Sequence, residues 1–133
     1  MSVPTKQREY TDSQTMTPDS GFDFFRAKMA FTTGPVELRR AIDRDEVNVV
    51  DVRAGNDYDE GHIPGAVSLP RDLWETAQGL VKDRPNVFVC YSIVCHLAAH
   101  AARDFAAQGY PVMELDGGMR EWRVHEMPIE VTQ

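Results

Sequence analysis

Cys90 is the residue whose type and position in this sequence most clearly favour chemistry. It closes the apolar run 86–90, and a helical pattern begins at His96 after a short loop. If the run is a parallel strand, Cys90 lies at the carboxyl edge of the sheet, where open α/β sheets bind their ligands. Free N–H groups of the loop and the positive end of the helix dipole would lower the pKa of its thiol from about 8.5 toward neutrality, which favours a nucleophilic thiolate. An inert, buried cysteine at a strand end is the alternative.

The elements that must position Cys90 follow from hydrophobic patterning. Short runs rich in β-branched residues predict strands over 48–52, 66–70, 86–90 and 112–115. Their continuous apolar character is typical of strands buried on both faces of a parallel sheet. Helices are predicted over about 35–44, which Pro35 begins, and over 96–108, where a stripe is formed by Leu97, Ala101 and Phe105. Strands that alternate with such helices predict an α/β fold with right-handed crossovers.

Length and composition favour one domain behind a short tail. The chain has 133 residues, of which 42% are hydrophobic and 26% charged, and such a chain can fold without a disulfide or a structural metal. Residues 1–19 contain no Leu, Ile or Phe, so we expect a disordered tail there and a domain over 20–133. The cluster from Phe22 to Phe31 predicts a short helix or strand, which covers either the sheet or a neighbouring subunit.

Charge and hydropathy exclude several classes of partner. Lys and Arg number 14 against 21 Asp and Glu, which gives a net charge of −7 and disfavours nucleic acid or an anionic membrane as the main partner. The sequence has no apolar run long enough to span a membrane, and its first twenty residues lack the apolar core of a secretory signal. We therefore expect a cytoplasmic protein, in which two cysteines are thiols rather than a structural bridge.

Four motifs occur in the order found in rhodanese-homology domains. In chain order they are Asp51-Val52-Arg53 with Tyr58, Gly61-His62-Ile63-Pro64-Gly65-Ala66 with Leu69-Pro70, the strand-terminal Cys90, and Gly117-Gly118-Met119-Arg120-Glu121-Trp122. On these motifs the sequence resembles the rhodanese-like family, and the likeness covers about 36–130. The resemblance implies a single domain with a mostly parallel sheet of about five strands and helices on both faces.

The same resemblance implies a sulfurtransferase in which Cys90 is the nucleophile. Such a cysteine takes a sulfane sulfur from thiosulfate or a persulfide and passes it to a thiol or to cyanide. The physical chemistry agrees, because attack on a sulfane sulfur is the same displacement as thiol–disulfide exchange and needs an exposed thiolate of low pKa. The partners implied are a small sulfur-containing anion or a persulfide donor, and a possible protein acceptor of sulfur.

The loop after Cys90 departs from the family pattern, in which four residues separate the cysteine from an arginine. Here Cys95 takes that place, so the site loses its bidentate anion clamp. Phosphatase activity is disfavoured, because His96 stands where related phosphatases have arginine. Thiosulfate turnover is expected to be slow, which favours a protein persulfide as donor. The expected substrate-binding residues are Tyr91, Ser92, Ile93, Val94, His96 and Arg53.

Cys95 opens alternatives to simple sulfur transfer. It could close a disulfide with Cys90 in one redox state, or attack a persulfide on Cys90 and release hydrosulfide, which would make the domain a redox switch or a persulfide reductase. It could also only fill a packing gap, and the loop could belong to a non-catalytic binding module. No metal is expected, because the spacing of Cys90, Cys95, His96 and His100 matches no common zinc pattern. No cofactor motif is present either.

Further residues of the motifs have a structural interpretation, and two of them, Asp51 and Arg53, also have a functional one. Asp51 and Arg53 are two residues apart at a strand end, so their side chains share a face and we expect an ion pair there rather than a catalytic carboxylate. Arg53 could instead lean toward the Cys90 loop and replace part of the missing charge. His62 is expected to be a hydrogen-bonded support, and the absent side chains of Gly117 and Gly118 let the backbone approach the neighbouring loop.

Overall fold

The computed structural model describes residues 16–132, and the chain divides into two units at Phe31. In the first unit the structure contains the helix α2 (Pro18–Phe31). The sequence predicted a short helix or a strand over Phe22–Phe31, and the structure shows a helix. The Thr17 side chain accepts a hydrogen bond from the Ser20 amide at 3.2 Å, and Asp19 in the first turn complements the helix dipole. The helix includes Pro18 and Asp19, so it begins within the last two residues of the predicted tail; residues 1–15 lie outside the described part.

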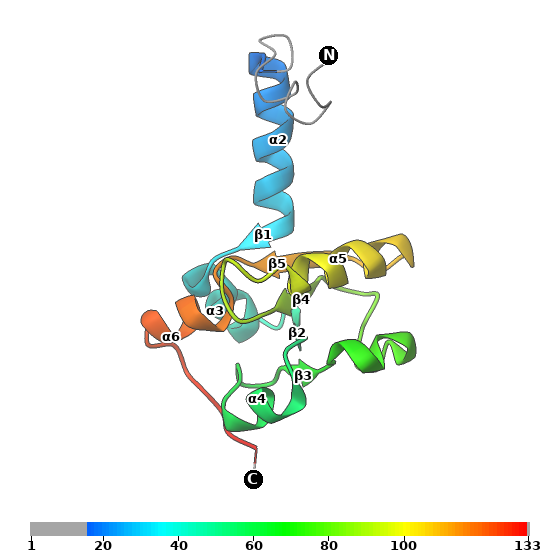
Figure 1. Cartoon of the computed structure of the whole chain (residues 1–133). Coiled ribbons are helices and arrows are strands. Elements are labelled where there is room, and N and C mark those ends of the chain that lie inside the picture. The colour runs from blue at the N-terminus through cyan, green and yellow to red at the C-terminus, as the bar shows by residue number, and fades with distance from the viewer. Residues whose placement is uncertain (1–15, 133) are drawn as a thin grey trace, which may run out of the picture. The chain divides into compact units, whose positions relative to one another are not determined.

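The second unit, Thr32–Gln133, contains a parallel five-stranded sheet (Figure 1). The strand order is β1-β5-β4-β2-β3, and every paired neighbour runs parallel. The strands are β1 (Thr32–Thr33), β2 (Asn48–Asp51), β3 (Val67–Ser68), β4 (Asn86–Val89) and β5 (Val112–Leu115). The predicted α/β fold with about five parallel strands is therefore confirmed. The edge strand β1 was not predicted, because two threonines are too short a run to carry a pattern.

Helices cover both faces of this sheet, and each face has its own hydrophobic core. Val87 and Val89 of β4 pack with Leu38 of α3 (Pro35–Asp43) and Trp122 of α6 (Gly118–Val124). The intervening Phe88 packs on the opposite face against Ala101 and Phe105 of α5 (Leu97–Ala107). Each large side chain buried in this way contributes about 1.5–3 kcal/mol, and the alternation explains why β4 is apolar throughout.

Two short helical elements flank the edge strand β3 along the chain, and the C-terminal segment pairs with the backbone at His62. The helix α4 (Gly55–Glu60) and the 3-10 helix η1 (Arg71–Thr76) flank β3 along the chain. His62 forms a two-bond antiparallel bridge with Glu130, with N···O distances of 2.9 and 2.8 Å. The His62 ring stacks on Tyr58 with the ring centroids 3.7 Å apart and hydrogen-bonds the Tyr58 carbonyl, which agrees with the expected supporting role.

Candidate active site at the carboxyl edge of the sheet

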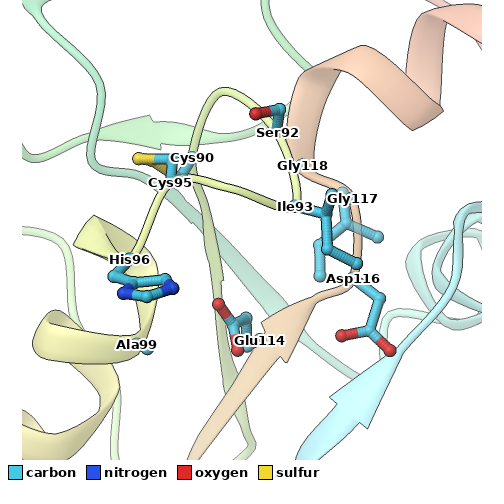
Figure 2. A pocket seen from close by; sticks show the side chains of 11 residues that line it. Cys90, Ser92, Ile93, Cys95, His96, Ala99, Glu114, Asp116, Gly117 and Gly118 are labelled. Atoms are coloured by element: carbon cyan, nitrogen blue, oxygen red, sulfur yellow. A yellow bond between two sulfur atoms is a disulfide. The ribbon is translucent and has the colours of Figure 1, made fainter.

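Cys90 follows the last residue of the central strand β4, and the loop 91–96 joins it to α5 (Figure 2). The expected position at the carboxyl edge of the sheet is thus observed. A cavity of about 140 Å³ opens beside this loop. Its walls come from the loop, the start of α5 and the turn between β5 and α6. The lining residues are Cys90, Ser92, Ile93, Cys95, His96, Ala99, Glu114, Leu115, Asp116, Gly117 and Gly118.

The first turn of α6 fixes the backbone of the loop. The Met119 amide donates to the Cys90 carbonyl at 2.9 Å, and the Arg120 amide donates to the Tyr91 carbonyl at 3.0 Å. Gly118 makes this approach possible, because a Cβ at that position would lie 2.5 Å from the Cys90 carbonyl oxygen and its φ is +58°. The prediction that the glycine pair lets the backbone approach the neighbouring loop is therefore confirmed.

Several backbone amides of the loop remain available for a ligand. The peptide bonds are trans, so the N–H groups that follow the Cys90 and Tyr91 carbonyls point away from α6. Within the described part of the chain, five loop amides have no hydrogen-bond acceptor, whereas the Cys95 amide donates to the Ser92 carbonyl at 3.0 Å. The five belong to Tyr91, Ser92, Ile93, Val94 and His96. Beside them, α5 begins with no side-chain cap on His96, which leaves its positive end uncompensated.

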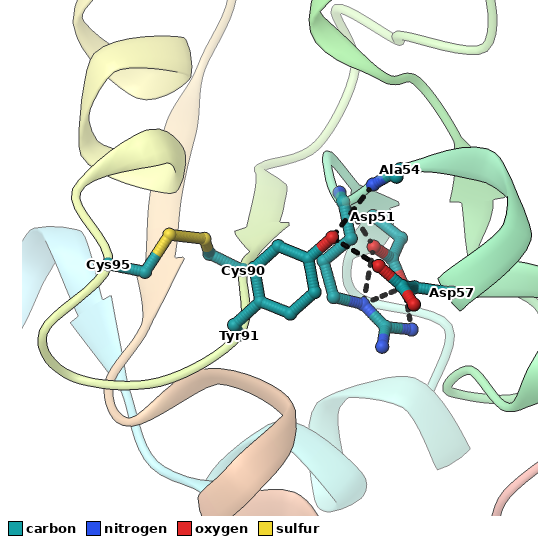
Figure 3. Close-up of a disulfide and its surroundings, with 7 residues drawn as sticks. Asp51, Ala54, Asp57, Cys90, Tyr91 and Cys95 are labelled. Carbon is teal, nitrogen blue, oxygen red and sulfur yellow. Dashed lines mark hydrogen bonds and ion pairs between the residues drawn. A yellow bond between two sulfur atoms is a disulfide. The ribbon is translucent and has the colours of Figure 1, made fainter.

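The two cysteines are joined in a disulfide across the loop (Figure 3). This observation corrects the expectation of two free thiols and matches the alternative in which the pair closes in one redox state. It also corrects the expectation of an exposed sulfur, because Cys90 is only 2% exposed in the bridged form. The Cα atoms are 6.4 Å apart, within the range that a disulfide spans, so Cys95 reaches Cys90 without any rearrangement of the sheet.

The structure brings together some of the predicted site residues and separates others. Cys90, Cys95, Ser92, Ile93 and His96 all line the cavity. Three predicted substrate-binding residues, Tyr91, Val94 and Arg53, do not line the cavity. Val94 is exposed on the loop surface, and Arg53 is buried.

Arg53 belongs to a buried network with Asp51 rather than to the cavity. Its guanidinium donates to Asp51 at 2.8 Å and to the Gly61 carbonyl at 2.7 Å, and Asp51 and Arg53 are 1% and 4% exposed. The expected ion pair is confirmed, and whether Arg53 also supplies charge to the cysteine loop stays a prediction. The Tyr91 ring lies over this guanidinium, and its hydroxyl donates to Asp57 and accepts from the Ala54 amide. Burial raises the pKa of Tyr91, and the bond to Asp57 raises it further.

Two cavity residues were missed by the sequence analysis, and both are carboxylates. Glu114 lies on β5 and Asp116 follows this strand, so both stand at the edge where Cys90 ends β4 (Figure 2). Burial raises the pKa of Glu114, Asp116 raises it further, and His96 acts in the opposite direction. The sequence predicted the strand 112–115, but it did not show that this strand pairs with the cysteine strand, and that pairing brings both carboxylates to the site.

Two other kinds of feature, a metal site and a membrane-spanning helix, are not found among the described residues. Among the described residues, no three His, Cys, Asp or Glu side chains are grouped so that they could hold a metal ion. No helix within residues 16–132 is both long and apolar enough to cross a membrane.

Comparison with known protein families decides what this fold and loop belong to. Residues 34–125 match the Rhodanese-like domain family. The chain belongs to the rhodanese family. This membership confirms the resemblance drawn from the sequence motifs, and it extends over the strand, loop and helix that carry Cys90.

Relatives of this rhodanese-like chain differ in the share of their length that the chain matches. It is 39% identical over 95 residues to the HTH-type transcriptional regulator Rv0324 of Mycobacterium tuberculosis, and the match covers 71% of the chain but 42% of that relative. It is 35% identical over 88 residues to the thiosulfate sulfurtransferase GlpE of Shewanella oneidensis, which covers 65% of the chain and 85% of GlpE. The chain therefore spans less than half of the mycobacterial protein but most of GlpE.

Solved structures show the same architecture. The BH2092 protein of Bacillus halodurans superposes with a TM-score of 0.79 at 32% identity, covering 87% of this chain and 88% of that protein. A thiosulfate sulfurtransferase of Pseudomonas aeruginosa superposes with a TM-score of 0.65 at 30% identity, covering 77% of this chain and 20% of the larger protein.

Proposed function

We propose that this rhodanese-like domain is a sulfurtransferase that carries a sulfane sulfur on Cys90. The observation that carries the proposal is the position of Cys90, which ends the central strand, lines the cavity and is followed by unpaired loop amides and the start of α5. Relatives named as sulfurtransferases, such as GlpE, support the same activity.

The reduced pair is the form that takes up sulfur. The Cys90 thiolate attacks the outer sulfur of thiosulfate, the sulfur–sulfur bond of the donor breaks, and sulfite leaves with the electron pair. The product is a persulfide anion on Cys90. Backbone N–H donors beside the sulfur stabilise the thiolate and the persulfide without reorganisation. A thiol or cyanide then attacks the outer sulfur, takes it away and restores the Cys90 thiolate.

The loop residues have assigned roles in this scheme. The amides of Tyr91, Ser92, Ile93, Val94 and His96 hold the anionic sulfur. The imidazole of His96 lies on the cavity wall and orients the donor. Ile93 and Val94 are 74% and 82% exposed, so they offer an apolar surface to a protein donor or acceptor of sulfur.

A second candidate function is favoured by the disulfide itself. If the Cys95 thiolate attacks the inner sulfur of the Cys90 persulfide, the two cysteines form the observed disulfide and hydrosulfide leaves. The step balances, because the outer sulfur leaves with the electron pair of the broken sulfur–sulfur bond and takes up the proton that the Cys95 thiol releases when it becomes a thiolate. A dithiol reductant then restores both thiols, as the reducing cytoplasm expected from the sequence would permit. In this form the domain is a persulfide reductase or a thiol redox switch.

One experiment separates the candidates. The reduced protein, Cys90→Ser and Cys95→Ser are incubated with thiosulfate, and intact masses are recorded without reductant. Sulfur transfer predicts one added sulfur on Cys95→Ser and none on Cys90→Ser, and the unsubstituted protein shows it too if Cys95 does not resolve the persulfide. Loss of two hydrogens from the unsubstituted protein, with hydrosulfide released, favours the reductase. No change in any of the three overturns both and leaves a binding module.

A further inference from the structure

We infer that Glu114 and Asp116 select the sulfur donor by excluding dianions, so that the domain takes sulfur from an organic persulfide in preference to thiosulfate. The inference rests on the proposed sulfur transfer through Cys90. It names the donor class and the two residues that set it.

The first support is the shared cavity. Cys90, Cys95, Glu114 and Asp116 line the same space of about 140 Å³ (Figure 2). A donor that enters this space to reach the Cys90 sulfur therefore comes within the field of both carboxylates. In so small a cavity the donor also loses much of its water, which strengthens every charge interaction inside it.

The second support is that, among the described residues, neither carboxylate is paired with a cation, and only His96 on the cavity wall favours the charged form of Glu114. Within residues 16–132, no hydrogen bond or ion pair is found for the side chain of Glu114 or Asp116. The described lining contains no lysine or arginine, and His96 is its one group that can carry positive charge. Arg53, a buried cation that contacts the loop through the Tyr91 ring, is paired with Asp51.

The third support is the sign of the interaction with each donor. Thiosulfate is a dianion, so it meets twice the repulsion that a monoanion meets at the same distance. An organic persulfide in its protonated form carries no charge on the sulfur that is transferred. The loop amides favour the anion formed on Cys90 whichever donor supplied the sulfur, and they also attract a thiosulfate dianion, so they oppose this selection. The two carboxylates carry full charges, and they therefore set the preference between donors.

The transfer step is the same for both donors. The Cys90 thiolate attacks the terminal sulfur of the hydropersulfide, that sulfur–sulfur bond breaks, and the organic thiolate leaves with the electron pair. The terminal sulfur keeps its proton and becomes the outer sulfur of the Cys90 persulfide. Because thiosulfate gives the same product with sulfite as the leaving group, the two rates can be compared directly.

The test measures sulfur uptake from thiosulfate and from benzyl hydropersulfide. All proteins are full-length, carry Cys95→Ser so that the persulfide persists, and are reduced before use. Rates are followed by intact mass in three charge-neutralising variants. Glu114→Gln and Asp116→Asn remove a cavity charge, and Glu75→Gln is the matched control, because Glu75 is an exposed residue of η1 outside the cavity lining.

We expect Glu114→Gln to raise the ratio of the thiosulfate rate to the hydropersulfide rate about five- to tenfold, in line with one unit charge removed at close range. Any gain from a lower pKa of Cys90 is common to both donors and cancels in this ratio. Asp116→Asn shifts the same ratio in the same direction, and Glu75→Gln leaves it unchanged. Added salt raises the thiosulfate rate by screening the repulsion, and it does so less in Glu114→Gln.

An unchanged ratio of the two rates in both cavity variants overturns the inference, whether neither rate changes or both rates rise equally. Absence of uptake from either donor in every protein is a different failure, because it removes the sulfurtransferase role and the inference together.

Discussion

The two sides of the Cys90 loop treat their charges in opposite ways. Toward β2, Asp51 and Arg53 are buried, paired with each other and further bound to the backbone at Gly61. Toward β5, Glu114 and Asp116 line a cavity, and their carboxylates have no hydrogen-bond or ion-pair partner among the described residues. Buried charges that are paired hold a structure in place, whereas unpaired charges beside a reactive group act on what approaches it. The first side therefore supports the loop, and we propose that the second acts on its substrate.

The largest effect is expected from breaking the buried pair. Arg53→Met leaves the Asp51 carboxylate buried without its cation, so we expect a loss of about 3–5 kcal/mol in the free energy of unfolding, measured by urea denaturation. The control is the double variant Asp51→Asn, Arg53→Met, which removes both charges and should lose clearly less. Equal losses in the two proteins would show that the pair does not fix this side of the loop.

A smaller loss is expected where α6 approaches the loop. Gly118→Ala places a Cβ 2.5 Å from the Cys90 carbonyl oxygen, at a φ of +58°. We expect about 1–3 kcal/mol of destabilisation in thermal or urea unfolding, together with slower sulfur uptake. Gly55→Ala is the matched control, because no atom lies within 4 Å of its Cβ position. Similar stability of the two variants would contradict the close approach.

Removal of the Tyr91 hydroxyl should reduce the free energy of unfolding less than Arg53→Met or Gly118→Ala does. Tyr91→Phe removes the hydrogen bonds to Asp57 and the Ala54 amide at a half-exposed site, so we expect a loss of about 1 kcal/mol. Tyr110→Phe provides the comparison, because no hydrogen bond to the Tyr110 hydroxyl is found in the described part of the chain. A loss from Tyr110→Phe as large as that from Tyr91→Phe would remove Tyr91 from the positioning network.

The smallest effect concerns the pH dependence of stability on the cavity side. The pKa of Glu114 is raised on folding, chiefly by burial and then by Asp116. Below the unfolded pKa of about 4.3 the carboxyl is protonated in both states, and its ionisation penalises the folded state as pH rises through the folded pKa. Glu114→Gln should therefore give a small gain in melting temperature at pH 7 and almost none at pH 4. A gain that is equal at both pH values would mean that the charge is not its cause.

The fold was predictable from sequence because its main signals are local. Continuous apolar runs identified β2, β4 and β5, and the i, i+4, i+8 stripe on Leu97 identified α5. Thr32–Thr33 could not be found, because a two-residue edge strand exists only through its pairing with β5. Cys90 was found by its place at a strand end. Glu114 and Asp116 were not, since strand order, and not the spacing of residues along the chain, brings them beside Cys90.

The redox state of the pair was also beyond the sequence. The spacing of Cys90 and Cys95 permits both two thiols and a bridge, and the distance between them depends on the turn that the Cys95 amide forms with Ser92. Arg53 was ambiguous for a similar reason. Its two-residue spacing from Asp51 predicted the ion pair, but only the structure shows its further contacts with the Gly61 carbonyl and the Tyr91 ring.

We propose that loop amides and the start of α5 activate the Cys90 sulfur. The pKa of the Cys90 thiol tests this most directly. In reduced Cys95→Ser, the rate of alkylation of Cys90 is measured as a function of pH. We predict a midpoint clearly below the value of about 8.5 for a free cysteine, and a further decrease when Glu114→Gln is added. A midpoint at or above 8.5 would contradict the account, because the carboxylates and burial would then outweigh the amides.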